Sequence, residues 1–250
     1  AFQNSYETKT SIGLEGTKSL SGRTLKDGEF TFEVKDKAGK VVATGSNKSD
    51  GSISFNNKLN YKLSDLEKAD GSYESEKTYE YTVNEVIPEG ATAENNYTVN
   101  GVTYDSKTVN VKVTVTYNKE TGELKAELAK DSEAIAFQNS YETKTSIGLE
   151  GTKSLSGRTL KDGEFTFEVK DKAGKVVATG SNKSDGSISF NNKLNYKLSD
   201  LEKADGSYES EKTYEYTVNE VIPEGATAEN NYTVNGVTYD SKTVYNSAYY

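Results

Sequence analysis

Apolar and polar residues alternate along most of the chain, in short runs that end at turn residues such as Asp50-Gly51. This two-residue period is typical of antiparallel β-strands with one buried face. Residues 30–34 and 109–117 show it most clearly. Helical periodicity does not extend beyond two turns, and only residues 64–67 predict a single helical turn. The pattern therefore predicts an all-β fold and disfavours an α/β fold.

The expected strands follow one another at short intervals within the first 141 residues, with polar turns between them. Seven or more strands at this spacing predict an immunoglobulin-like β-sandwich. They are expected around residues 12–20, 30–34, 41–43, 53–55, 59–63, 79–85, 109–117, 124–128 and 135–141.

Residues 1–109 recur without change as residues 136–244. A repeat of this length is a whole domain and not a solenoid unit. Residues 1–6 are expected to be the last strand of a preceding repeat, 7–141 a complete β-sandwich repeat, and 142–250 a second copy that is altered or truncated at its C-terminal end. Because the linker is short and contains neither Gly nor Pro, we expect tandem domains arranged as a rod.

Three polar residues fall in phase with the apolar face of their strands: Lys18, Glu85 and Asn139. Each is expected to point into the core. Buried Lys and Glu are rare unless they are paired. One interpretation is a buried ion pair with the amide hydrogen-bonded nearby.

The same trio also supports a covalent bond. Burial lowers the pKa of a Lys and raises that of a Glu, so the Lys18 amine can be nucleophilic and Glu85 a proton donor. Glu85 is expected to polarise the side-chain oxygen of Asn139 and relay protons to the departing ammonia. The product is a Lys18–Asn139 isopeptide bond between the first and last strands.

Three segments carry a resemblance to a known family: 16–33, 79–86 and 137–141. They resemble the streptococcal pilin-type isopeptide linkage domain, a CnaB-like module of Gram-positive pili and surface adhesins. The resemblance implies an extracellular, cell-wall-anchored stalk protein. It also implies that the family's Lys, Glu and Asn correspond to Lys18, Glu85 and Asn139.

The second copy retains Lys153 and the candidate catalytic Glu220 but departs from the repeat after Val244. This departure leaves three alternatives open. Asn246 replaces the lost Asn, a strand of another molecule presents Asn4 to Lys153, or the copy is truncated and forms no bond.

Composition narrows the function further. The chain has no Cys and no His, and 39 acidic against 30 basic residues give a net charge of −9. These features disfavour disulfides, thiolate or imidazole metal sites, nucleic acid and anionic membranes as partners. Single Asp-Gly pairs indicate turns and not calcium loops. No cofactor and no membrane insertion are expected, and the lack of a starting Met suggests a fragment.

The leading hypothesis is a structural stalk repeat whose partners are neighbouring repeats of the same polypeptide, with a host surface ligand bound through other regions. The alternative is an adhesin module that binds a host protein or glycan with repeat avidity. An enzyme is not expected, because the only reactive set would consume its own residues.

Overall fold

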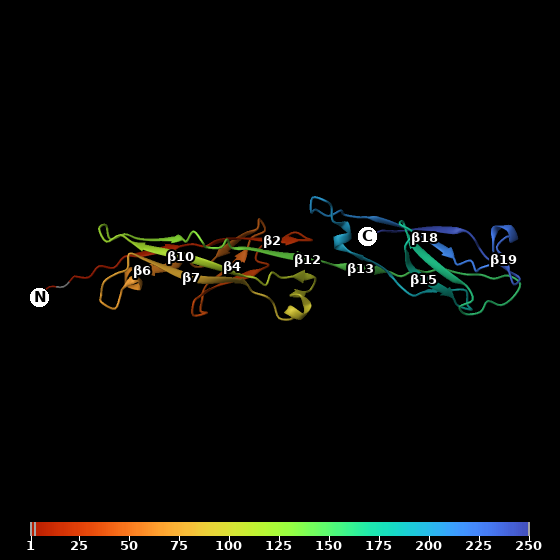
Figure 1. Ribbon diagram of the computed structural model, residues 1–250, viewed down its shortest axis with the longest axis horizontal. Coiled ribbons are helices and arrows are strands. Elements are labelled where there is room, and N and C mark those ends of the chain that lie inside the picture. Colours follow the sequence, from red (N-terminus) through yellow and green to blue (C-terminus); the bar gives the residue numbers. More distant parts are fainter. Residues whose placement is uncertain (1, 3, 250) are drawn as a thin grey trace. The chain divides into compact units, whose positions relative to one another are not determined.

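The computed structural model describes Phe2 and residues 4–249. The chain divides into two compact units, Ala1–Tyr141 and Glu142–Tyr250. Ala1 and Gln3 of the expected strand 1–6, and Tyr250 of the expected second copy, lie outside the described residues. Figure 1 shows that strands make up nearly all of the regular structure of both units.

The first unit contains twelve described strands and two short 3₁₀ helices. The first helix, η1 (Leu63–Leu66), confirms the predicted helical turn. The elements are β1 (Lys9–Ile12), β2 (Glu15–Ser21), β3 (Thr31–Asp36), β4 (Val41–Asn47), β5 (Ser52–Phe55), β6 (Leu59–Lys62), η1, β7 (Glu76–Glu85), η2 (Ala93–Asn95), β8 (Thr98–Val99), β9 (Val102–Thr103), β10 (Thr108–Tyr117), β11 (Leu124–Leu128) and β12 (Ala136–Tyr141).

Ten of these strands form one curled sheet in the order β11-β10-β7-β3-β4-β5-β2-β12-β9-β8, and β1 pairs with β6 separately. Phe32 on β3 and Phe137 on β12 are several strands apart in this order, yet their ring centroids lie 5.1 Å apart. The sheet therefore folds over its own apolar face, as a sandwich requires. The all-β, immunoglobulin-like fold class is confirmed.

Two details differ from the expected strands. The first expected strand is divided at Gly13 and Leu14, because β1 pairs with β6 whereas β2 pairs with β5 and β12. The β8–β9 hairpin was not predicted, since each of its strands has only two residues. Alternation cannot be recognised in so short a run.

The second unit repeats this plan in part, with its own core around Val169 and Tyr196. No helix among residues 2 and 4–249 is long and apolar enough to cross a membrane. The elements are β13 (Lys144–Ile147), β14 (Thr166–Asp171), β15 (Val176–Asn182), β16 (Ile188–Phe190), β17 (Leu194–Lys197), η3 (Leu198–Leu201), β18 (Thr213–Glu220), η4 (Ala228–Asn230), β19 (Thr233–Val234), β20 (Val237–Thr238) and β21 (Thr243–Tyr249).

The last described strand of the second unit takes the place of β10. β21 pairs antiparallel with β18, and Thr243 lies opposite Asn219, just as Thr108 lies opposite Asn84 in the first unit. The residues after Val244 thus continue the long strand. The position that β12 fills beside β2 is not filled by any described residue of the second unit.

Candidate functional site

The three predicted site residues of the first unit come from three different strands. β2 carries Lys18, β7 ends at Glu85, and β12 carries Asn139. β12 runs parallel to β2 with Phe137 opposite Lys18, so the Asn139 side chain emerges two residues further on, on the same face. All three residues are buried, with 3%, 5% and 4% of their surfaces exposed.

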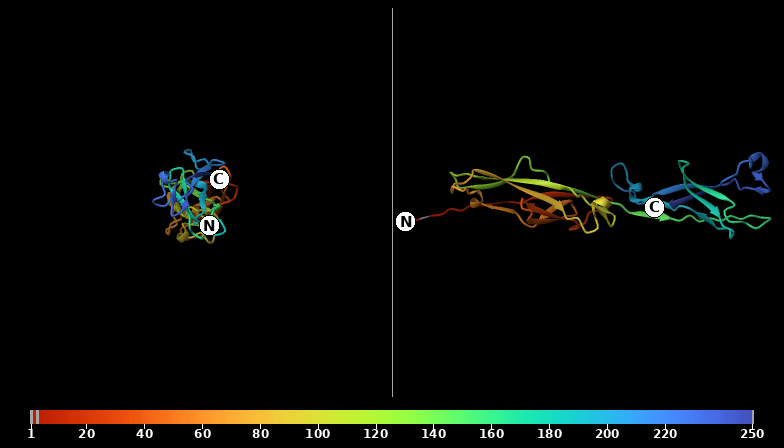
Figure 2. Two further views of the ribbon diagram at one scale, coloured as in Figure 1. Left: turned by 90° about the vertical axis from the view of Figure 1, so that its right-hand side faces the viewer. Right: turned by 60° about the horizontal axis from the view of Figure 1, so that its bottom comes forward.

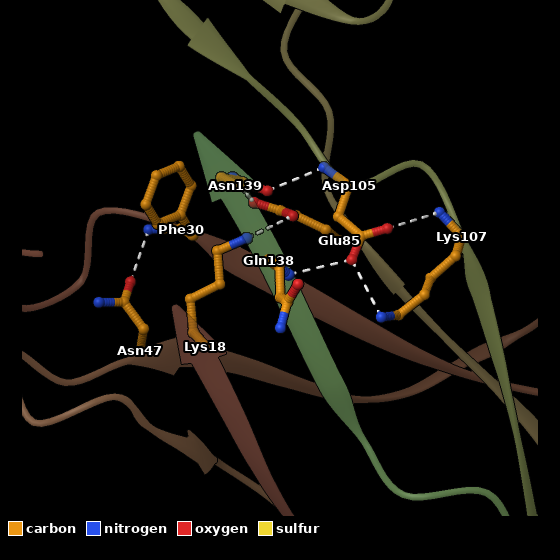
Figure 3. A network of polar contacts seen from close by, with 8 residues as sticks. All are labelled: Lys18, Phe30, Asn47, Glu85, Asp105, Lys107, Gln138 and Asn139. Carbon is orange, nitrogen blue, oxygen red and sulfur yellow. Dashed lines mark hydrogen bonds and ion pairs between the residues drawn. The ribbon is translucent and has the colours of Figure 1, made fainter. Parts of the chain in front are cut away.

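Glu85 connects the other two side chains. The Lys18 ammonium group donates to Oε2 of Glu85 at 2.7 Å, and the Asn139 amide nitrogen donates to Oε1 at 2.7 Å. Figure 3 shows the Lys18 and Asn139 side chains meeting at this carboxylate. One carboxylate therefore touches both nitrogen atoms that an isopeptide reaction would exchange.

Aromatic walls give the site its low polarity. The Lys18 nitrogen lies 4.6 Å from the ring centroid of Phe30 and 5.9 Å from that of Phe32. Burial lowers the pKa of Lys18, although Glu85 opposes this shift. Burial also raises the pKa of Glu85, against the hydrogen bond from Lys18. Both predicted directions are confirmed, and both favour the neutral pair.

The backbone around Lys18 is fixed by a turn and a buried amide. The Lys18 N–H donates to the carbonyl of Gly51 at 2.7 Å. Gly51 has φ +88°, and a Cβ there would lie 2.9 Å from the Lys18 carbonyl oxygen, so glycine suits both the turn and the close approach. Asn47 accepts the N–H of Phe30 at 2.7 Å and holds that aromatic wall.

Asp105 belongs to the site, and sequence reasoning missed it. Its backbone N–H donates to Oδ1 of Asn139 at 2.8 Å, and its carboxylate accepts the N–H groups of Gln138 and Lys107 at 3.0 and 3.2 Å. Lys107 also forms an ion pair with this carboxylate at 3.0 Å (Figure 3). Asp105 lies in a loop without alternation, so the sequence held no signal for it.

This contact corrects one expectation. Glu85 was expected to polarise the side-chain oxygen of Asn139, but that oxygen accepts the N–H of Asp105, and Glu85 contacts the amide nitrogen. A backbone N–H aimed at a carbonyl oxygen stabilises negative charge that develops there. Glu85 instead lies where it can carry protons from the amine to the leaving nitrogen.

The second unit has part of this arrangement. The Lys153 ammonium group donates to Oε2 of Glu220 at 2.9 Å, and the N–H of Asp240 donates to the same oxygen at 3.0 Å. Oε1 of Glu220 is buried and has no hydrogen-bond partner among the described residues. The Lys–Glu pair is thus repeated, but no described residue of the second unit supplies the amide that joins it in the first unit.

The two Asn candidates for Lys153 are placed differently from Asn139. Asn246 lies on β21 opposite Tyr216 and is exposed, and its side-chain oxygen accepts the N–H of Ser247. It lines the same cavity as Lys153, without a hydrogen bond to Glu220 among the described contacts. Asn4 is exposed and precedes the first strand. A bond from Lys153 to either Asn stays a prediction.

Among residues 2 and 4–249, no group of three or more His, Cys, Asp or Glu side chains is arranged for a metal ion.

The chain was compared with curated proteins, solved structures and protein families. No curated protein matches the chain. Among solved structures, it is similar to the Bacillus anthracis TIE protein with 19% identity and a TM-score of 0.25, over 96% of this chain and 31% of that one. The chain thus spans about a third of that protein's length. It is also similar to the major pilin from Streptococcus pyogenes with 17% identity and a TM-score of 0.31, over 88% of this chain and 83% of that one.

The family described as Spy0128-like isopeptide containing domain, FctA, matches residues 14–142 and again residues 149–248. The two matches cover most of the chain and confirm the resemblance to a pilin-type isopeptide domain. Domains of this kind are structural and not catalytic, which agrees with the expectation that the chain is not an enzyme. The chain belongs to the FctA family of Spy0128-like isopeptide containing domains.

Proposed function

We propose that this chain is a stalk segment of a pilus or adhesin on the surface of a Gram-positive bacterium, extracellular and anchored to the cell wall. A self-formed Lys18–Asn139 isopeptide bond stabilises its first unit. The observation that carries the proposal is the buried Glu85 carboxylate, hydrogen-bonded at 2.7 Å to both the Lys18 ammonium group and the Asn139 amide. The whole-domain repeat supports the stalk role, because each copy adds length to a structural protein.

The bond forms in one sequence of proton transfers. Glu85 takes a proton from Lys18, and the neutral amine attacks Cγ of Asn139 while the N–H of Asp105 stabilises the developing oxyanion. Glu85 then delivers protons to the amide nitrogen. One C–N bond forms and one breaks without oxidation. Lys18 gives up two protons, and the Asn139 nitrogen leaves with them as ammonium.

The bond would suit a stalk because of the strands that it joins. β2 and β12 are parallel neighbours near the two ends of the first unit's chain, so the crosslink closes nearly the whole unit. Pulling force on the chain ends would then pass through a covalent bond and not through the hydrogen bonds of the curled sheet. Since the chain contains no Cys, a disulfide cannot supply this link.

Intact mass under denaturing conditions tests the proposal. The chain should weigh less than its sequence by about 17 Da, one ammonia, for the bond in the first unit. Lys18→Ala and Glu85→Ala should each restore the mass expected for their sequences. Lys58→Ala, at an exposed lysine of the same unit, is the matched control and should keep the loss. A wild-type chain of full mass would refute the bond.

A further inference from the structure

Asn139 lies between two aromatic side chains of its own strand. Phe137 and Tyr141 are two residues before and after it on β12, so all three side chains emerge on the same face. Phe137 packs against Phe32, with 5.1 Å between the ring centroids. Arg23 covers the Tyr141 ring, and its guanidinium carbon lies 4.8 Å from the ring centroid. A guanidinium group is attracted to the face of a tyrosine ring.

Tyr141 lies just beyond the part of β12 that pairs with β2. The last pair in that register joins Ser140 and Ser21. The Tyr141 backbone pairs with Val102 of β9 instead. The right view of Figure 2 shows the end of β12, in green, beside the yellow segment that contains η2, β8 and β9. The contact with Arg23 therefore connects this end of β12 to the loop that follows β2.

Glu29 holds the Arg23 side chain in place. One guanidinium nitrogen donates to Oε2 of Glu29 at 3.1 Å, and the other contacts Oε1 of the same carboxylate. Two contacts of this kind fix the plane of a guanidinium group. The pair is also partly sheltered from solvent, since the Arg23 side chain is 30% exposed and that of Glu29 is 21% exposed. Arg23 thus presents its flat face at a defined place.

The loop of residues 22–29, which contains this pair, is fixed to the core of the first unit. Its Leu25 is buried and belongs to the core cluster. Glu29 is followed directly by Phe30, whose ring centroid lies 4.6 Å from the Lys18 nitrogen. One loop therefore leads from the cation that covers Tyr141 to the aromatic wall of the Lys18 amine.

The register of β12 decides whether the amide of Asn139 reaches Glu85. A shift by one residue turns Asn139 away from the core. A shift by two residues keeps the apolar face buried, but it places Phe137 or Tyr141 at the Glu85 carboxylate and removes the amide. Either shift also separates Tyr141 from Arg23. The contact between these two side chains therefore favours the register in which the bond can form.

We propose that Arg23 is a positioning residue for the isopeptide reaction. Held by Glu29, it receives the ring of Tyr141 and so sets the register in which Asn139 meets Lys18. The described contacts of Arg23 are with Thr24, Glu29 and Tyr141 and not with the reacting atoms. It increases the fraction of folded chains whose amide carbon lies within reach of the amine. This inference rests on the proposed function, because it concerns the same bond.

The rate of bond formation in the full chain tests the role of Arg23. Intact mass is followed after cell-free synthesis, at a temperature low enough to resolve the wild-type reaction. Arg23→Ala and Tyr141→Leu should each slow the loss of ammonia about fivefold. Tyr141→Phe keeps the ring and should react at the wild-type rate. Lys26→Ala removes a positive charge from an exposed position of the same loop and is the matched control, also with the wild-type rate.

A double variant separates positioning from a general loss of stability. If Arg23 acts through the Tyr141 ring, Arg23→Ala/Tyr141→Leu should be no slower than the slower single variant. Independent structural effects would multiply instead, to about 25-fold. Thermal melting of each variant combined with Lys18→Met should show that the first unit folds without the bond.

Three results would overturn the inference while leaving the proposed function intact. These are an Arg23→Ala chain that loses ammonia at the wild-type rate, a Tyr141→Phe chain as slow as Tyr141→Leu, and single effects that multiply in the double variant. A wild-type chain that never loses ammonia would instead overturn the proposed function, and the inference with it.

Discussion

Replacement of Lys18 by Met should lower the stability of the first unit by far more than a lost hydrogen bond. Met fills much of the apolar volume of the lysine stem but has no amine, so the isopeptide bond cannot form. Glu85 remains buried and keeps its hydrogen bond from Asn139. Since burial already raises the pKa of this carboxyl, it can remain neutral in the variant, and no uncompensated charge is created.

The size of the expected stability loss depends on the length of the loop that the isopeptide bond closes. Lys18 and Asn139 are separated by about 120 residues, and a covalent link over such a loop stabilises a fold by about 5 kcal/mol through the entropy of the unfolded chain. The lost hydrogen bond to Glu85 adds about 1–3 kcal/mol. For a unit of this size, the crosslink alone corresponds to about 15–20 °C in Tm.

The second unit provides the matched control, because Lys153→Met removes the same kind of contact with Glu220. Calorimetry should show the first unit's transition falling by about 15–25 °C in Lys18→Met, and the second unit's by less than about 10 °C in Lys153→Met. Equal shifts of the two transitions would refute the reasoning, since the crosslink would then contribute nothing.

Three further variants test how the site is held. Asp105→Ala should slow bond formation about tenfold, because the N–H that polarises the amide oxygen loses its anchor; a time course of ammonia loss after cell-free synthesis of the chain measures this, and an unchanged rate would contradict it. In Lys18→Met, the pKa of Glu85 is raised by burial, so the folded state keeps a proton that the unfolded state releases above the ordinary pKa of 4.5. Urea titrations should therefore show the free energy of unfolding falling as pH rises from 4.5 toward the raised pKa. The double variant Lys18→Met/Glu85→Gln should lack this pH dependence, and a free energy of unfolding that rises with pH would contradict the raised pKa of Glu85. Asn47→Ala leaves the N–H of Phe30 unpaired and should lower the free energy of unfolding by about 2–4 kcal/mol in denaturant titrations. Asn182→Ala should have the same effect in the second unit. A loss below about 0.5 kcal/mol in both variants would show that water replaces the amide.

The sequence determined the strands and the reactive trio because both depend on local periodicity. A strand places every second side chain on one face, so Lys18, Glu85 and Asn139 were assigned to the core from their phase with apolar neighbours. The structure buries all three. Likewise, the repeat made the second Lys–Glu pair visible, because residues 153 and 220 lie in an unchanged copy of the same sequence.

Only the tertiary structure decided how these groups meet. Asp105 reaches Asn139 from a loop 34 residues away, and no alternation marks such a residue, since its position depends on the way the chain returns past β12. The sequence also left open the course of the chain after Val244. Strand pairing decided it, because β21 continues along β18. Hydrogen bonding between strands that are distant in the sequence determines which strand the chain pairs with, and the alternation along a single strand does not predict that pairing.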